Sequence, residues 1–111
     1  MAKAKTVYIC SPLSGDIENN IRKAKLYGKY AFKRGMAPVI PHIYAEILCD
    51  DIPSERELGM RADRELLFKC DELWVFGDTI TKGMKEEIHF AKMINMKIKY
   101  ISNSEVDKYE C

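Results

Sequence analysis

Four short segments of the chain are apolar and rich in β-branched or aromatic residues, which is the pattern of buried β-strands. They cover residues 5–10, 37–40, 72–76 and 98–101. Each segment is followed by glycine, proline or polar residues, where the chain is expected to turn or to leave the sheet. The pattern therefore predicts a strand at each of these four places.

Between the strands, apolar residues recur every three or four positions, which predicts amphipathic helices. The predicted helices cover residues 16–35, 54–70 and 84–95. Asp16 is a suitable N-cap for the first helix, and Ser54 with Glu57 predicts a capping box for the second. Residues 44–48 are left open as a possible helix, and the polar residues 102–111 are expected to be frayed.

Strands that alternate with helices favour parallel βαβ units, with helices on both faces of one sheet. We therefore predict an α/β protein, a Rossmann-like (flavodoxin-like) three-layer sandwich with a mostly parallel sheet of four to five strands. One domain over residues 1–111 is expected, because the chain is too short for a second core. Ligands of such sheets bind outside the carboxyl ends of the strands, here residues 11–15, 41–42 and 77–83.

Two acidic residues fall on apolar helical stripes that should face the sheet. Asp63 shares a stripe with Leu67, and Glu87 shares one with Met84 and Ala91. A buried carboxylate is costly unless it is paired or protonated, and burial raises its pKa. Two interpretations stay open for each residue. Asp63 is either a proton donor or a residue that caps a loop or pairs with Arg61 or Arg64. Glu87 is either a reactive group or a complement to the helix dipole.

The predicted geometry brings these two carboxylates to one pocket. The helix of Asp63 runs antiparallel to the strand that follows it, so a few residues along that strand the chain is again level with Asp63, and Glu87 follows the loop at the end of the same strand. Paired carboxylates in unlike environments suit chemistry at a glycosidic bond, where one acts on the anomeric carbon and the other protonates the leaving group. Tyr8 in the first strand can offer its hydroxyl to a carboxylate. Simple packing of a buried strand tyrosine stays open as the alternative.

The loop after the first predicted strand offers hydroxyls and a flexible glycine before a helix. Ser11, Ser14 and Gly15 can form an anion site there, although the loop matches neither a Walker motif nor G-x-G-x-x-G, and an ordinary βα turn stays open. His42 follows the second strand. It is either a ligand contact or a histidine that caps its loop.

A second candidate anion site follows the third predicted strand. Thr81, Lys82 and Gly83 open the last helix, and Lys82 adds a positive charge. Thr81 can equally be a plain N-cap.

Composition narrows the classes of function. A net charge of +1 gives no overall field towards a nucleic acid polymer or an anionic membrane. The chain has no signal-peptide pattern and no long apolar run, so a cytoplasmic location is expected. Four cysteines and two histidines lack metal-ligand spacing, so no metal is expected. Cys10 and Cys70 are interpreted as small core residues.

The candidate residues form one series of motifs along the chain. Val7 to Cys10 come first and are followed by Ser14-Gly15. Asp63 then lies eight residues before Asp71, and the last motif is Thr81-x-Gly83-x-x-x-Glu87-x-x-x-Ala91. This order and spacing resemble the nucleoside 2-deoxyribosyltransferase superfamily. The likeness is greatest to its small deoxyribosyltransferase-like branch and to the related deoxynucleoside 5′-monophosphate N-glycosidases. It covers residues 5–101 and agrees with the predicted fold.

The resemblance implies that Glu87 attacks C1′ of the sugar and forms a covalent glycosyl-enzyme, that Asp63 helps the base to leave and that Tyr8 orients the nucleophile. The sugar then passes to another base or to water. No metal or organic cofactor is implied. Thr81 beside Lys82 favours a nucleotide over a nucleoside. Further phosphate contacts are expected from Ser11, Ser14, Gly15 and Gly83, with Ser14 in the place of an arginine used by the hydrolases.

The expected partners are a small-molecule nucleoside or nucleotide and further copies of the chain, in a homodimer or larger homo-oligomer. The alternative function is a non-catalytic nucleotide-binding module that senses or sequesters a nucleotide with the same pocket.

Overall fold

A computed structural model describes residues 3–107. Four strands form one sheet in the order β2-β1-β3-β4, and every neighbouring pair is parallel. The strands are β1 (Thr6–Cys10), β2 (Ala37–Val39), β3 (Glu72–Phe76) and β4 (Lys97–Ile101). The predicted α/β class and Rossmann-like arrangement are therefore confirmed, with a fully parallel sheet.

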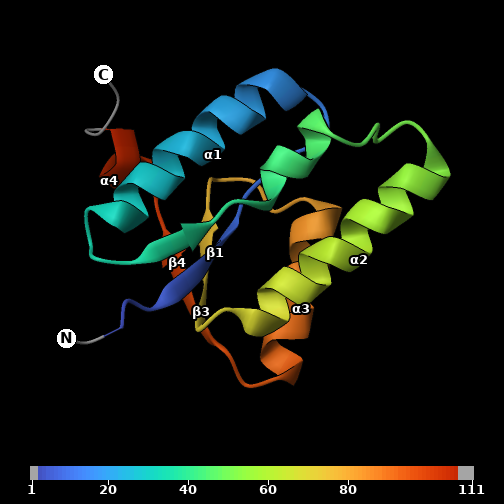
Figure 1. The fold of residues 1–111 in the computed structure, drawn as a ribbon. Helices are drawn as coiled ribbons and strands as arrows, with labels where there is room; N and C mark the ends of the chain where they lie inside the picture. The colour runs from blue at the N-terminus through green and yellow to red at the C-terminus, as the bar shows by residue number, and fades with distance from the viewer. Residues whose placement is uncertain (1–2, 108–111) are drawn as a thin grey trace.

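Helices cover both faces of the sheet and give three layers (Figure 1). α1 and α4 pack on one face, and α2 and α3 pack on the other. A short 3₁₀ helix, η1, follows β2. The bounds are α1 (Ile17–Phe32), η1 (Pro41–Glu46), α2 (Pro53–Lys69), α3 (Lys82–Met93) and α4 (Asn103–Asp107).

The alternation of side chains along β1 divides the core into two halves. Val7 and Ile9 pack beneath α1, whereas Tyr8 and Cys10 point to the side of α2 and α3. All four side chains are fully buried, because a central strand between two helical layers has no solvent face. A polar group on Tyr8 must therefore find its partner inside the α2 and α3 layer.

The first two long helices, α1 and α2, begin in different ways. Asp16 caps α1 as predicted, and its carboxylate accepts from the backbone N–H of Asn19. The predicted capping box at Ser54 and Glu57 is wrong, because α2 begins earlier, at Pro53, with no side-chain cap. Proline lacks an N–H and has a fixed φ, so it suits the first helical position without a capping side chain.

Two segments differ from the sequence predictions. The possible helix at 44–48 is instead the 3₁₀ helix at Pro41–Glu46, whose first residue is again a proline. The predicted fraying after Ile101 is wrong for residues 103–107, which form α4. Val106 is buried against the core beneath α1, so one apolar residue fixes this short helix. Residues 108–111 lie outside the described part of the chain.

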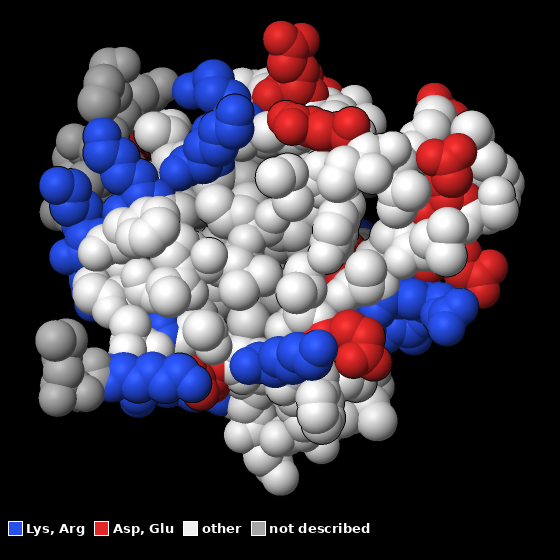
Figure 2. Space-filling model, viewed as in Figure 1, with Lys and Arg blue, Asp and Glu red and all other residues white. Residues whose placement is uncertain are grey.

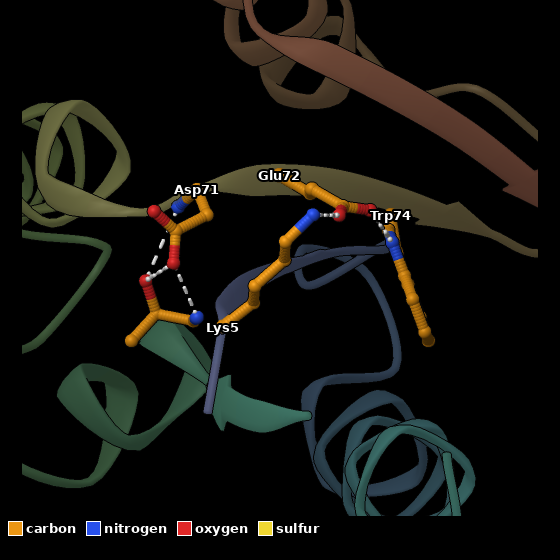
Figure 3. Close-up of polar contacts among 5 residues, drawn as sticks. Lys5, Asp71, Glu72 and Trp74 are labelled. Carbon is orange, nitrogen blue, oxygen red and sulfur yellow. Dashed lines mark hydrogen bonds and ion pairs between the residues drawn. The ribbon is translucent and has the colours of Figure 1, made fainter. Parts of the chain in front are cut away.

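The amino ends of β1 and β3 are joined by polar contacts (Figure 3). Asp71 accepts from the backbone N–H of Thr6 at 2.7 Å and from its hydroxyl at 3.2 Å. Glu72 is buried and accepts from the indole N–H of Trp74 at 3.0 Å, and Lys5 Nζ lies 3.6 Å from its other oxygen. These groups lie at the amino ends of the strands, away from the carboxyl edge.

No helix within residues 3–107 is long and apolar enough to cross a membrane. On the face shown in Figure 2, basic and acidic side chains both border a central area of uncharged residues. Charge of one sign does not cover this face, in agreement with the net charge of +1.

Candidate active site

The strand order reverses between β1 and β3, because the chain leaves β1 towards β2 and later returns to the other side. In parallel sheets this reversal opens a crevice at the carboxyl ends of the two strands, and ligands bind there. The loops that follow these strands hold residues 11–15 and 77–81. Both lead into helices, α1 and α3.

Glu87 lies in the second turn of α3 and points back towards β1. Its Oε2 accepts a hydrogen bond from the hydroxyl of Tyr8. Burial raises the pKa of Glu87 to about 7, although the Tyr8 hydrogen bond opposes the rise. The pKa of Tyr8 is raised well above its usual value, first by burial and then by the charge of Glu87. Tyr8 therefore stays a neutral donor and Glu87 its acceptor.

Asp63 lies on α2, on the same side of the sheet as Glu87. Burial raises its pKa to about 7, and its charge in turn raises the pKa of Glu87 and of Tyr8. Its Oδ1 is buried and has no hydrogen-bond partner among residues 3–107. A buried carboxyl oxygen that has no donor favours the protonated form of the group.

The two carboxyl groups thus titrate near neutral pH in unlike surroundings. The hydrogen bond from Tyr8 stabilises negative charge on Glu87, whereas the bare Oδ1 of Asp63 favours a proton there. Because both pKa values are about 7, the surroundings and not the pKa values distinguish the two groups: Glu87 is the better carboxylate and Asp63 the better acid, the pair of roles that paired-carboxylate enzymes use.

Ser11 and His42 form a buried pair at the carboxyl ends of β1 and β2. His42 Nε2 lies 3.0 Å from Ser11 Oγ and 3.1 Å from the backbone carbonyl oxygen of Ser11. A carbonyl oxygen can only accept, so its contact with Nε2 favours the tautomer with hydrogen on Nε2, and in that tautomer Nε2 cannot take a proton from Ser11. Burial lowers the pKa of His42, which keeps the ring neutral. The pair shapes the loop and does not form an activated serine.

The rest of the loop after β1 becomes exposed at Ser14 and Gly15 and is held by a side chain of α1. The side-chain amide of Asn20 donates to the carbonyl oxygens of Leu13 at 2.9 Å and Ser14 at 3.2 Å. Gly15 has a φ of +96°, which favours glycine at this turn. Ser14 and Gly15 therefore lie in a fixed, solvent-facing turn just before α1.

Thr81, Lys82 and Gly83 form the start of α3. The Thr81 hydroxyl accepts from the backbone N–H of Met84 at 3.3 Å, so Thr81 is an N-cap, as one of the two interpretations proposed. Lys82 and Gly83 are exposed in the first helical turn.

Sequence reasoning missed the part that Cys10 has in this site, because a cysteine in a buried strand is typical of a core residue. Its Sγ lies 3.4 Å from Oε1 of Glu87. The spacing carried a usable signal, since Cys10 is two residues after Tyr8 and so shares its face of β1. Buried Glu72 was also missed, but it lies at the opposite end of the sheet.

One protein-family model, described as Domain of unknown function (DUF7768), matches residues 5–101. The chain belongs to the DUF7768 family. No curated protein matches the chain.

The part of the DUF7768 domain covered by the match contains every residue of the candidate site, from Tyr8 to Glu87. The family description names no activity, so function must be argued from the geometry. Within residues 3–107 the domain has no group of three or more His, Cys, Asp or Glu side chains placed to hold a metal ion.

Proposed function

We propose that this domain cleaves or transfers the N-glycosidic bond of a nucleoside or (deoxy)nucleoside 5′-monophosphate through a covalent glycosyl-glutamate intermediate. The observation that carries the proposal is that Glu87, bound by Tyr8, lies close enough to Asp63 for the Asp63 charge to raise its pKa, while Oδ1 of Asp63 is buried without a hydrogen-bond partner among the described residues. Both pKa values are raised to about 7 by burial. The resemblance to nucleoside 2-deoxyribosyltransferases supports the same assignment.

The first half of the reaction is a displacement at C1′ of the sugar. A lone pair of the Glu87 carboxylate forms a C1′–O bond while the C1′–N bond breaks. The bonding electrons leave with the base, which takes the proton of Asp63. The products are a glycosyl ester of Glu87, a neutral free base and ionised Asp63.

The second half returns the enzyme to its starting state. Water, or a nitrogen of a second base, attacks C1′ and displaces the Glu87 carboxylate. Asp63 accepts the proton that the attacking group loses. Attack by water gives hydrolysis, and attack by a base gives transfer.

A nucleotide is the substrate class that the surrounding loops support best. Ser14 and Gly15 lie just before α1, with Ser11 buried at the start of the same loop, and Lys82 and Gly83 lie in the first turn of α3. A helix N-terminus offers N–H groups and a positive dipole end, which suit a phosphate. Here the N–H groups of Asn19 and Met84 are already bound by the caps Asp16 and Thr81, so a phosphate would use the remaining first-turn N–H groups. Lys82 adds a full positive charge beside the second of these helix ends.

We also propose that the domain forms a homo-oligomer through α2 and α3. These helices flank an open groove, and two of its apolar side chains, Leu58 and Phe68, are 54% and 61% exposed. Arg64 and Glu65 beside them give the groove both signs of charge, so a second copy in antiparallel orientation can pair with it. Small domains gain stability from such burial.

Sedimentation velocity tests the assembly. We expect the wild-type protein to be a dimer or larger, Phe68→Ser to dissociate it, and Phe32→Ser, an equally exposed phenylalanine on α1, to leave it intact. A wild-type monomer at high concentration would contradict the proposal.

The activity is tested by chromatography of free base after incubation with a panel of deoxynucleoside 5′-monophosphates, ribonucleotides and nucleosides. Glu87→Ala is expected to abolish base release, whereas Glu86→Ala, which changes the exposed neighbour on α3, is expected to retain it. If no compound of the panel releases a free base, but one nucleotide raises the melting temperature of the protein, the non-catalytic nucleotide-binding module is supported instead.

A further inference from the structure

Cys10 and Tyr8 hold the same carboxylate from the same face of β1. Tyr8 donates to Oε2 of Glu87, and the Cys10 thiol, with Sγ 3.4 Å away, donates to Oε1. Each oxygen therefore has its own donor. Two donors at fixed points on one rigid strand restrain rotation of the carboxylate, which a single donor does not do.

The surroundings of Cys10 exclude both a disulfide and an ionised thiolate at this position. Its side chain is fully buried, and no disulfide forms at this position. Burial, and then the nearby charge of Glu87, raises the pKa of the thiol far above its usual value. The thiol therefore stays protonated, so it is neither a nucleophile nor a redox group. Its S–H has Glu87 Oε1 as acceptor, with the Met84 carbonyl oxygen at the longer distance of 4.0 Å.

We propose that Cys10 is a positioning residue that holds Oε1 of Glu87 as the attacking oxygen. The inference rests on the function proposed above. The donors differ in strength, because a phenol O–H binds a carboxylate oxygen strongly and a thiol S–H is a weak donor. Negative charge is thus stabilised mainly on Oε2, while Oε1 stays oriented and more nucleophilic.

The proposed step balances without any change at sulfur. An Oε1 lone pair forms the bond to C1′, the C1′–N bond breaks, and the leaving base takes its proton from Asp63. The thiol keeps its proton throughout and gives up only a weak hydrogen bond as Oε1 becomes an ester oxygen.

The contact is tested without any substrate by carbon-13 NMR titration of the Glu87 carboxyl. Cys10→Ala is expected to raise the Glu87 pKa above its wild-type value of about 7, because a donor to the charged form is lost. Cys10→Ser restores a donor and is expected to reverse the rise. Cys70→Ala, which removes another buried thiol from the same half of the core, is the matched control and should change nothing.

An unchanged Glu87 pKa in folded Cys10→Ala would overturn the positioning role. If that variant does not fold, the wild-type protein supplies the test through the infrared S–H stretch of Cys10, assigned by its loss in Cys10→Ser. A band that moves as pH crosses about 7 supports the contact, because the acceptor then changes its charge. A band that stays in place overturns it.

Kinetics separate this inference from the proposed function. With a substrate from the base-release panel, Cys10→Ala is expected to lower kcat roughly threefold to tenfold with KM unchanged, the effect of one weak hydrogen bond, and Cys10→Ser to restore it. No base release by the wild-type protein would overturn the proposed function, and the catalytic role of Cys10 with it. Base release with an unaltered kcat in Cys10→Ala would overturn the role of Cys10 alone.

Discussion

The hydroxyl of Tyr8 on β1 donates to Oε2 of Glu87 on α3, although the two residues are 79 positions apart in the sequence. The contact crosses the sheet–helix boundary just below the carboxyl end of β1. It distinguishes Glu87 from its exposed neighbour Glu86, because Glu87 is the α3 carboxylate held against β1.

Removing this hydroxyl should change the ionisation of Glu87. In Tyr8→Phe the carboxylate loses a donor to its charged form, so its pKa rises above about 7. We expect base release to fall roughly tenfold to a hundredfold near neutral pH, the effect of a hydrogen bond to a charged group, and the acid limb of the pH–rate profile to move to higher pH. Tyr27→Phe, which removes a hydroxyl bound to Asn103 on the other face, should leave the profile unchanged.

Asp63 should lower the stability of the folded protein at alkaline pH. Its folded pKa of about 7 lies above the ordinary value of 3.8, so the folded state binds its proton more tightly than the unfolded chain does. The contribution of protonated Asp63 to the free energy of unfolding is fully present below pH 3.8 and is lost as the pH rises through about 7.

Asp63→Asn removes the charge that must be buried. We expect the variant to be more stable than wild type above pH 7 by roughly 1 to 2 kcal/mol, a value reduced for partial solvent exposure, and to match it near pH 4. Urea unfolding followed by the fluorescence of Trp74, the only tryptophan, measures the difference. Asp51→Asn is the exposed control, and a gain that does not depend on pH would refute the assignment.

Asp71 should show the opposite dependence. Its hydrogen bonds from the N–H and hydroxyl of Thr6 lower its pKa, so its stabilising effect is present above the ordinary value of 3.8 and is lost as pH falls through the lower folded value. Asp71→Asn should therefore have a lower Tm than wild type at neutral pH and nearly the same Tm in strong acid. Calorimetry checks this, with exposed Glu57→Gln as control; equal Tm values at neutral pH would contradict it.

Glu72 should stabilise the core through the indole of Trp74. Glu72→Leu leaves a buried N–H without its acceptor, and we expect a loss of about 1 to 3 kcal/mol in the free energy of unfolding. Glu72→Gln keeps an amide oxygen at the same place, so it should recover most of that loss. Denaturant unfolding of both variants tests this, and an equal loss in the two would show that the indole contact contributes little.

The sequence by itself determined the elements and their order. β1, β3 and β4 appear at their predicted places because alternating β-branched and aromatic residues leave little choice of conformation. The stripe positions of Asp63 and Glu87 were also readable, since a 3.6-residue period fixes which face of a helix a residue occupies. Local sequence signals gave the wrong prediction at two places. α2 begins at Pro53 and not with a Ser54 cap, and a polar segment forms α4 because Val106 is buried against the rest of the core.

Only the tertiary structure decided which of these groups meet. The contacts of Glu87 with Tyr8 and Cys10 depend on the parallel register of β1 beside β3 and on how α3 packs, and neither is encoded in local periodicity. The raised pKa values of Asp63 and Glu87 follow from burial, which no single segment contains. Chain pattern fixes conformation over a few residues, whereas desolvation and hydrogen bonding across the core arise only once distant elements pack together.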